Sequence, residues 1–187
     1  DMNLSSKFQE VFLRQQKEVK LRQSTSRPML STSSTKAILI LNMAARNLIG
    51  VKPKDRVLIL DLKQEATGMH NRFFITRGFE SGGNTFGMKL SENGGFMDAH
   101  FYNLFLGNDF SAMSLSKNDL QLMGVMGKRD TRKRQGVEVP LRKVSYELAP
   151  YTETAPDGRV VSEFSIAPGM PPQPVFALTN PEVTELT

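Results

Sequence analysis

Residues 36–61 read KAILILNMAARNLIGVKPKDRVLILD, and this stretch decides the fold. Its first part, 37–41, is a compact apolar run that predicts a buried strand. Asn42 suits the N-cap of a helix over the following MAARNLI, because its amide oxygen can accept a backbone N–H. Gly50 is expected just after that helix, where glycine adopts the left-handed conformation at little cost. A Lys-Pro turn then leads into a second strand, 56–60, so the stretch predicts a strand–helix–strand unit.

This unit resembles the AbrB/SpoVT/MazE family of swapped-hairpin β-barrels, over residues 36–77. The matching residues are Ile38, Leu39 and Ile40 in the strand, Ala45 and Arg46 in the helix, Ile49 and Gly50, then Lys52, Pro53 and Asp55 before Val57, with RFFITRGF as the third β-element. Asn42 stands where the family usually has Pro. Lys54 stands where it has Gly, which reaches positive φ more easily.

The resemblance implies a homo-oligomer, at least an obligate dimer. Each subunit would give a hairpin to a shared barrel, because one such unit is too small to close a core alone. It also implies binding of duplex DNA, mainly through phosphate contacts, in a regulatory or architectural role. The basic residues that match the family's DNA-binding positions are Arg27, Lys36, Arg46, Lys52, Lys54 and Arg56.

Two segments precede this unit. Residues 1–23 are expected to form an arm with an amphipathic helix over 4–23, where Phe8, Val11, Phe12 and Val19 share one side. Such a helix can dock on the core, dock on a second subunit, or lie along nucleic acid. Residues 24–35 are rich in Ser and Thr, which predicts a linker with a short strand near Met29.

The rest of the chain predicts short strands and helices within a β-rich core domain, 36–166. We expect strands at 72–77 and 85–90 and a helix over 97–105, while 114–126 is ambiguous. Alternating residues from 137 and a turn at 156–158 predict a C-terminal β-hairpin over 137–166.

The last segment, 168–187, has five prolines and no basic residue, which predicts an extended tail lying along another surface. The expected fold class is therefore mainly β with short helices: an AbrB-like swapped-hairpin barrel with an N-terminal helix, a C-terminal β-hairpin and an extended Pro-rich tail.

The distribution of charge gives a second candidate site. The net charge is +5, from 24 basic and 19 acidic residues, which permits an anionic partner without requiring one. The densest basic cluster consists of Lys128, Arg129, Arg132, Lys133 and Arg134. It is either a solvated loop or a phosphate-binding site that gains affinity by counterion release.

The sequence carries no pattern of catalytic or metal-binding residues. Cysteine is absent, which excludes a thiol nucleophile, disulfides and Cys-based zinc sites. The two histidines, His70 and His100, lack metal-like spacing to carboxylates. The Gly-Gly pairs at 82–83 and 94–95 lack the Lys-Ser/Thr of a phosphate loop. We therefore expect a non-enzymatic protein without metal or cofactor.

Three functional hypotheses remain. The first is a dimeric DNA-binding protein. The second is a structural or assembly protein that binds neighbouring subunits through residues 1–23 and 168–187. The third is an antitoxin-like inhibitor whose tail fills a cleft in its target. No apolar run approaches the ~20 residues of a membrane span, and the N-terminal residues lack a secretory h-region. We expect a cytoplasmic protein, or one within a virion or other large assembly, without membrane contact.

Overall fold

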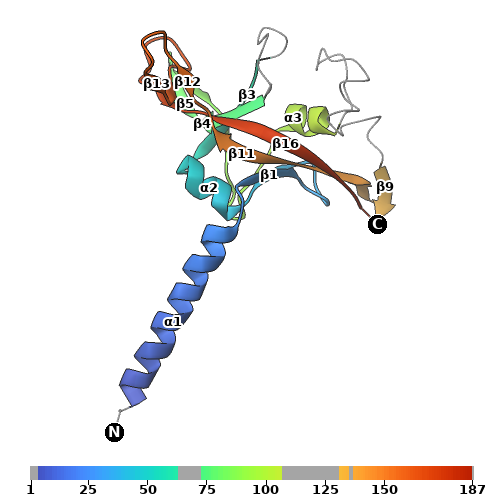
Figure 1. Ribbon diagram of the computed structural model, residues 1–187. Helices are drawn as coiled ribbons and strands as arrows, with labels where there is room; N and C mark the ends of the chain where they lie inside the picture. Colours follow the sequence, from blue (N-terminus) through green and yellow to red (C-terminus); the bar gives the residue numbers. More distant parts are fainter. Residues whose placement is uncertain (1–3, 63–72, 107–130, 135–136, 187) are drawn as a thin grey trace.

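The chain folds around one antiparallel sheet of eight strands, which curls into a nearly closed barrel, as a computed structural model shows (Figure 1). The structure describes residues 4–62, 73–106, 131–134 and 137–186. In spatial order the strands are β7 (Met88–Lys89), β3 (Arg56–Asp61), β4 (Phe73–Arg77), β16 (Phe176–Glu185), β11 (Arg142–Pro150), β1 (Met29–Thr32), β2 (Leu39–Leu41) and β8 (Gly95–Phe96). The expected class, mainly β with helices, is confirmed.

Three helices and four small two-stranded ladders complete the described part of the chain. The helices are α1 (Leu4–Thr25), α2 (Met43–Ile49) and α3 (Ala99–Phe105). The ladders are β5 (Phe79–Ser81) with β6 (Asn84–Phe86), β9 (Thr131–Arg134) with β10 (Val137–Pro140), β12 (Glu153–Thr154) with β13 (Val160–Val161), and β14 (Glu163–Phe164) with β15 (Gln173–Pro174).

The predicted strand–helix–strand unit is confirmed in its local detail. Asn42 caps α2, because its side-chain oxygen accepts the N–H of Ala45 at 2.9 Å. Gly50 follows the helix with φ 81°, in the left-handed region. The two strands of the unit do not pair with each other: β2 lies between β1 and β8, whereas β3 lies between β4 and β7. Helix α2 therefore carries the chain from one end of the sheet to the other.

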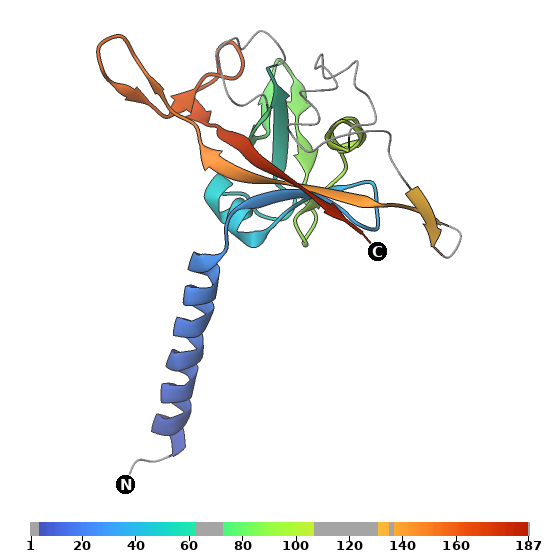
Figure 2. The ribbon, with the colours of Figure 1, turned by 45° about the vertical axis from the view of Figure 1, so that its right-hand side comes forward.

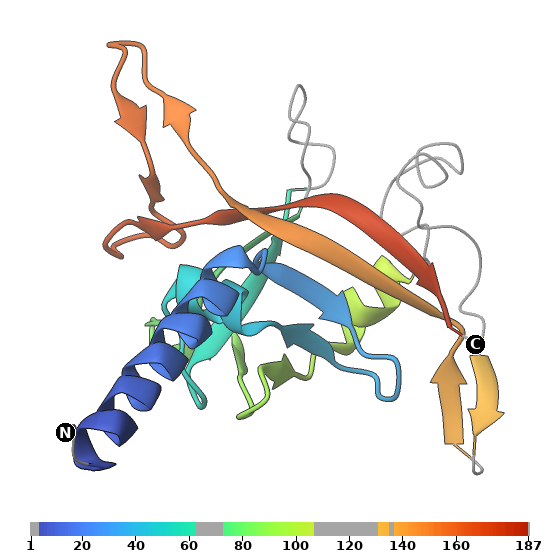
Figure 3. The ribbon, with the colours of Figure 1, turned by 60° about the horizontal axis from the view of Figure 1, so that its bottom comes forward.

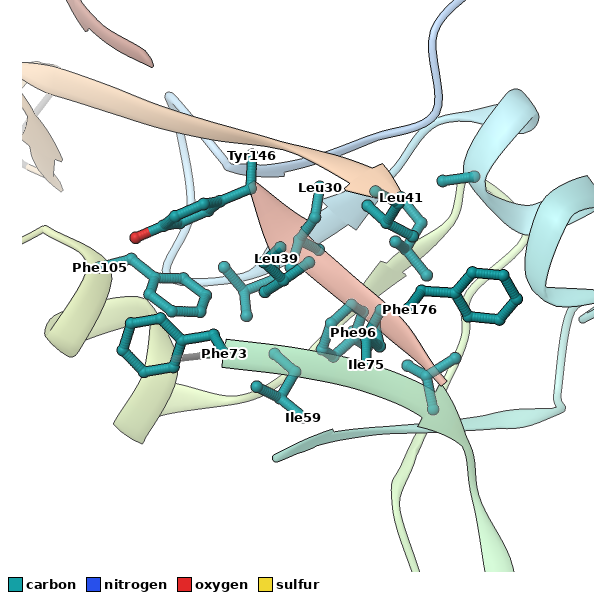
Figure 4. Packing of buried hydrophobic residues seen from close by; sticks show 14 of the residues in the cluster. Leu30, Leu39, Leu41, Ile59, Phe73, Ile75, Phe96, Phe105, Tyr146 and Phe176 are labelled. Atoms are coloured by element: carbon teal, nitrogen blue, oxygen red, sulfur yellow. The ribbon is translucent and has the colours of Figure 1, made fainter. Parts of the chain in front are cut away.

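One apolar core fills the barrel. Alternate residues of the strands face inward, including Leu39, Ile75 and Tyr146 (Figure 4). Helix α3 packs against the same core, with the rings of Phe73 and Phe105 edge to face at 5.1 Å. Such a core supplies most of the folding free energy, since burial of apolar surface is the main favourable term.

The C-terminal segment corrects one expectation. Residues 176–185 form β16, which pairs with β4 and β11 in the middle of the sheet, and Phe176 and Leu178 are buried. The segment is therefore not a free tail available to fill a partner's cleft. Pro181 fits within a strand because it lies at a bulge, where Asn180 has φ 49° and the register with β11 shifts.

The predicted hairpin over 137–166 is also wrong in its pairing. Strand β11 pairs with β1 and β16, not with residues 160–166. Its inward side chains, such as Val144 and Leu148, are buried in the core of the barrel. Residues 153–174 instead form the short β12–β13 and β14–β15 ladders, which project beyond one end of β11 (Figure 2).

Helix α1 stands away from the barrel in all three overall views (Figure 3). Residues 4–15 are all exposed, so of the expected arrangements, docking on the chain's own core is wrong for this part of the helix. Within the described residues, no helix is long and apolar enough to cross a membrane.

Candidate functional site

Two of the predicted DNA-binding residues are engaged with the backbone of neighbouring segments. Arg46 donates through Nη1 to the carbonyl oxygen of Glu92 at 3.2 Å, and Arg56 donates through Nη1 to that of Gly87 at 2.9 Å. Both arginines are half-buried. Their guanidinium groups therefore tie α2 and β3 to the segment between β6 and β8.

The other basic candidates near the unit are exposed but do not form one patch. Arg27 lies beside Glu147, with Nη1 3.6 Å from a carboxylate oxygen. Lys36 lies in the turn after β1, at the opposite end of that strand from Arg27. Strand β1 has four residues, which separates its first and last residues by about 10 Å. Lys52 and Lys54 project from the turn before β3.

Lys54 adopts a conformation that glycine prefers. Its φ is 76°, in the left-handed region, at the position where the resembled family has Gly. The turn is held from both sides, since the N–H of Lys54 donates to Leu90 at 2.9 Å and the N–H of Lys52 donates to the carboxylate of Asp55 at 2.9 Å. The turn geometry is therefore kept by its hydrogen bonds in spite of the local backbone strain.

We predict that Lys54→Gly stabilises the fold. The left-handed region costs a non-glycine residue about 1–2 kcal/mol, while the added freedom of glycine in the unfolded chain costs about 0.4–1 kcal/mol. The free energy of unfolding should rise by about 0.5 kcal/mol. Chemical denaturation measures it, with Lys52→Gly as the matched control that removes the same charge and is expected to destabilise. Equal losses for both variants would contradict the strained turn.

The basic cluster is described only in part. Arg132, Lys133 and Arg134 belong to β9, which pairs with β10, so this part forms a strand and not a loop, and its binding of phosphate stays a prediction. Lys128 and Arg129 lie outside the described residues, as does His70. The β9–β10 ladder lies near the end of the long β11–β16 pair, away from α1 (Figure 3).

Asp98 and His100 are accounted for by helix α3. Asp98 caps this helix, accepting the N–H of Phe101 at 3.2 Å. Burial raises the pKa of the Asp98 carboxyl, while the hydrogen bond from Phe101 and the nearby His100 lower it. The His100 ring packs edge to face on Phe101 at 4.9 Å. No group of three or more potential ligands that could hold a metal is found in the part of the chain that the structure describes.

A groove that the sequence did not reveal lies where the barrel fails to close. Strands β7 and β8 are the two outer strands of the sheet, and a hollow of about 390 Å³ opens beside them. We call it the seam groove. Its lining consists of Ile38, Met88, Lys89, Leu90, Ser91, Gly95, Phe96 and Met97. Met88 and Met97 lie close to each other in the sequence. They line one groove because β7 and β8 are the two outer strands of the sheet.

The outer half of α1 carries the second exposed apolar surface. Phe8 and Phe12 are 69% and 59% exposed, and Leu4, Val11 and Leu13 are exposed as well. We call Leu4, Phe8, Val11 and Phe12 the helix face. The sequence predicted this amphipathic helix. It did not show that the apolar side of the helix would stay exposed in the described part of the chain.

No family model, curated protein or solved structure matches this chain. Its function must therefore be inferred from the helix face, the seam groove and the exposed basic residues.

Proposed function

We propose that this chain is a non-enzymatic structural or assembly protein, whose barrel presents α1 to a neighbouring protein subunit. The observation that carries the proposal is the exposure of the helix face, above all of Phe8 and Phe12. Contiguous apolar patches larger than a few hundred Å² are rare on monomeric soluble proteins and mark sites of contact.

The energetics of α1 favour a partner. Burying one Phe side chain is worth about 1.5–3 kcal/mol. A helix that stands alone in water is only marginally stable, because most helical stability in proteins comes from packing an amphipathic side. Contact along the helix face would therefore stabilise the helix and the complex together. A virion, or another large assembly, is the setting that we propose for such contacts.

Fewer C-terminal residues are available for contact with a neighbouring subunit than the sequence suggested. Residues 176–178 are buried in the sheet, so they cannot contact another subunit while the barrel is folded. Pro171 and Pro172 are exposed, in the loop before β15. In this proposal the loop supplies a secondary contact, and α1 supplies the main one.

Photo-crosslinking tests the proposal. A photoreactive phenylalanine analogue at position 8, in the cells that naturally make the protein, should give one discrete adduct with a protein subunit. The same analogue at Thr184, an exposed position of β16, should give none. Adducts of equal yield from both positions, or no adduct from position 8, would count against a specific contact at α1.

A second candidate is binding of duplex DNA by an AbrB-like barrel. The strand–helix–strand unit and the exposed Arg27, Lys52 and Lys54 favour it. Within one chain β2 and β3 already have sheet partners on both sides. A dimer would therefore have to form through other surfaces, or by exchanging these strands between copies.

The DNA hypothesis predicts a salt-dependent affinity. The double variant Lys52→Gln/Lys54→Gln should reduce the slope of log K against log salt by about 2, because each phosphate contact contributes about 0.9. Arg159→Gln, which alters an exposed arginine paired with Asp157, should leave the slope unchanged. Fluorescence anisotropy with duplex DNA over about 50–200 mM salt measures this slope. Undetectable or salt-independent binding would exclude the hypothesis.

A further inference from the structure

The excess positive charge of the chain lies in one short segment. Residues 128–143 contain seven of the 24 basic residues and two of the 19 acidic ones, so this segment carries the whole net charge of +5. The remaining 17 basic and 17 acidic residues balance each other. The structure describes 131–134 and 137–143 of the segment, as β9, β10 and the beginning of β11.

Strands β9 and β10 form a two-stranded ribbon outside the barrel sheet. They pair with each other and with none of the other described strands. The chain continues from β10 through Leu141 into β11, and the carbonyl oxygen of Leu141 accepts the N–H of Leu186 at 2.7 Å. Val139 and Pro140 are buried, which anchors the base of the ribbon. We call β9 and β10 the basic ribbon; it lies beyond the end of the β11–β16 pair (Figures 2 and 3).

Two of the three cations in β9 have no acidic residue at their level of the ribbon. The register places Arg132 and Arg134 opposite valines of β10, whereas Lys133 lies opposite Glu138. The attraction of the basic ribbon for an anion therefore depends mainly on the two arginines.

The beginning of β11 adds less to this attraction, because acidic residues of β16 lie beside it. Arg142 is opposite Glu185 in the register, and Lys143 is opposite Thr184. Glu182 and Glu185 are both exposed. Within the described residues of the segment, the excess charge therefore belongs to the ribbon more than to its base.

We propose that the basic ribbon binds duplex DNA in the major groove, with Arg132 and Arg134 as its main phosphate contacts. This site goes beyond the proposed function, which depends on α1. It also differs from the barrel site of the DNA hypothesis above, which depends on Lys52 and Lys54. Cations that neutralise phosphates gain affinity by releasing the counterions of the DNA.

The dimensions of the ribbon suit the groove. The major groove of B-DNA is about 12 Å wide and about 8.5 Å deep, and it admits a two-stranded β-ribbon. Paired strands lie about 4.8 Å apart, and the four residues of each strand span about 10 Å from first to last. Duplex RNA has a deep, narrow major groove that protein elements do not enter. The ribbon should therefore distinguish the two duplexes.

The composition of the segment favours a duplex over other polyanions. Residues 128–143 contain no aromatic residue, whereas proteins that bind single strands stack the bases on aromatic side chains. Segments that bind a membrane surface combine basic residues with Trp, Phe or Leu, and neither strand of the ribbon contains any of these. Positive charge on a narrow ribbon is thus the feature that a partner must recognise.

A charge-neutralising variant tests the site. Arg132→Gln/Arg134→Gln should weaken binding of a fluorescent DNA duplex at least about tenfold at about 100 mM salt, and should lower the slope of log K against log salt by about 2. The matched control is Lys52→Gln/Lys54→Gln, which removes the same two charges from the barrel and should leave the slope unchanged. Fluorescence anisotropy over about 50–200 mM salt measures both quantities.

A second variant gives an effect of opposite sign. Glu138→Gln removes the carboxylate opposite Lys133, so it should strengthen binding a few-fold. Loss of folding cannot produce such a gain, and thermal unfolding checks that both ribbon variants keep the barrel. An RNA duplex of the same sequence should bind at least about tenfold more weakly than the DNA, because its major groove does not admit the ribbon.

Several results would overturn the inference. Undetectable binding of duplex DNA is one, and equal losses from the ribbon variant and the barrel variant, which would show diffuse attraction, are another. A loss confined to the barrel variant would favour the barrel hypothesis instead. Equal affinity for the RNA duplex would exclude insertion in the major groove. Crosslinking at position 8 does not depend on any of these results, so the proposed function succeeds or fails separately.

Discussion

The side chain of Asn42 joins the elements on which both the barrel and its arm depend. Its oxygen accepts the N–H of Ala45 at 2.9 Å and the N–H of Met29 at 3.0 Å, and its nitrogen donates to the carbonyl of Arg27 at 2.7 Å. One amide thus starts α2, holds the beginning of β1, and fixes the chain just after α1 ends. Because these three hydrogen bonds fix the chain between α1 and β1, helix α1 leaves the sheet at a defined place.

The second constraint is that the chain supplies its own sheet. Strand β16 returns from the C-terminal segment to lie between β4 and β11, and its first residues are buried in the core. The apolar core of the barrel is therefore built from side chains of one chain. Among the described residues, exposed apolar side chains of α1 and of the seam groove are available for contact between molecules, as are Phe86 and Val160.

The sequence predicted the local parts of this fold and missed the non-local ones. The cap at Asn42, the left-handed Gly50 and the helix between them depend on neighbouring residues, so their patterns were readable. The place of β16 depends on pairing with strands more than 25 residues away, and a proline such as Pro181 argues against a central strand unless it lies at a bulge. Likewise, the roles of Arg46 and Arg56 follow from carbonyl groups that lie 31 or more residues away.

Hydrogen–deuterium exchange at high and low protein concentration tests most directly whether the barrel is self-sufficient and α1 depends on a partner. On dilution, amides of residues 4–15 should lose protection, because the proposal places the contacts of α1 between molecules. Amides of β4, β11 and β16 should keep theirs, because these strands pair within one chain. Loss of protection in these three strands together with α1 would show that the barrel itself requires a second copy, and would contradict the account.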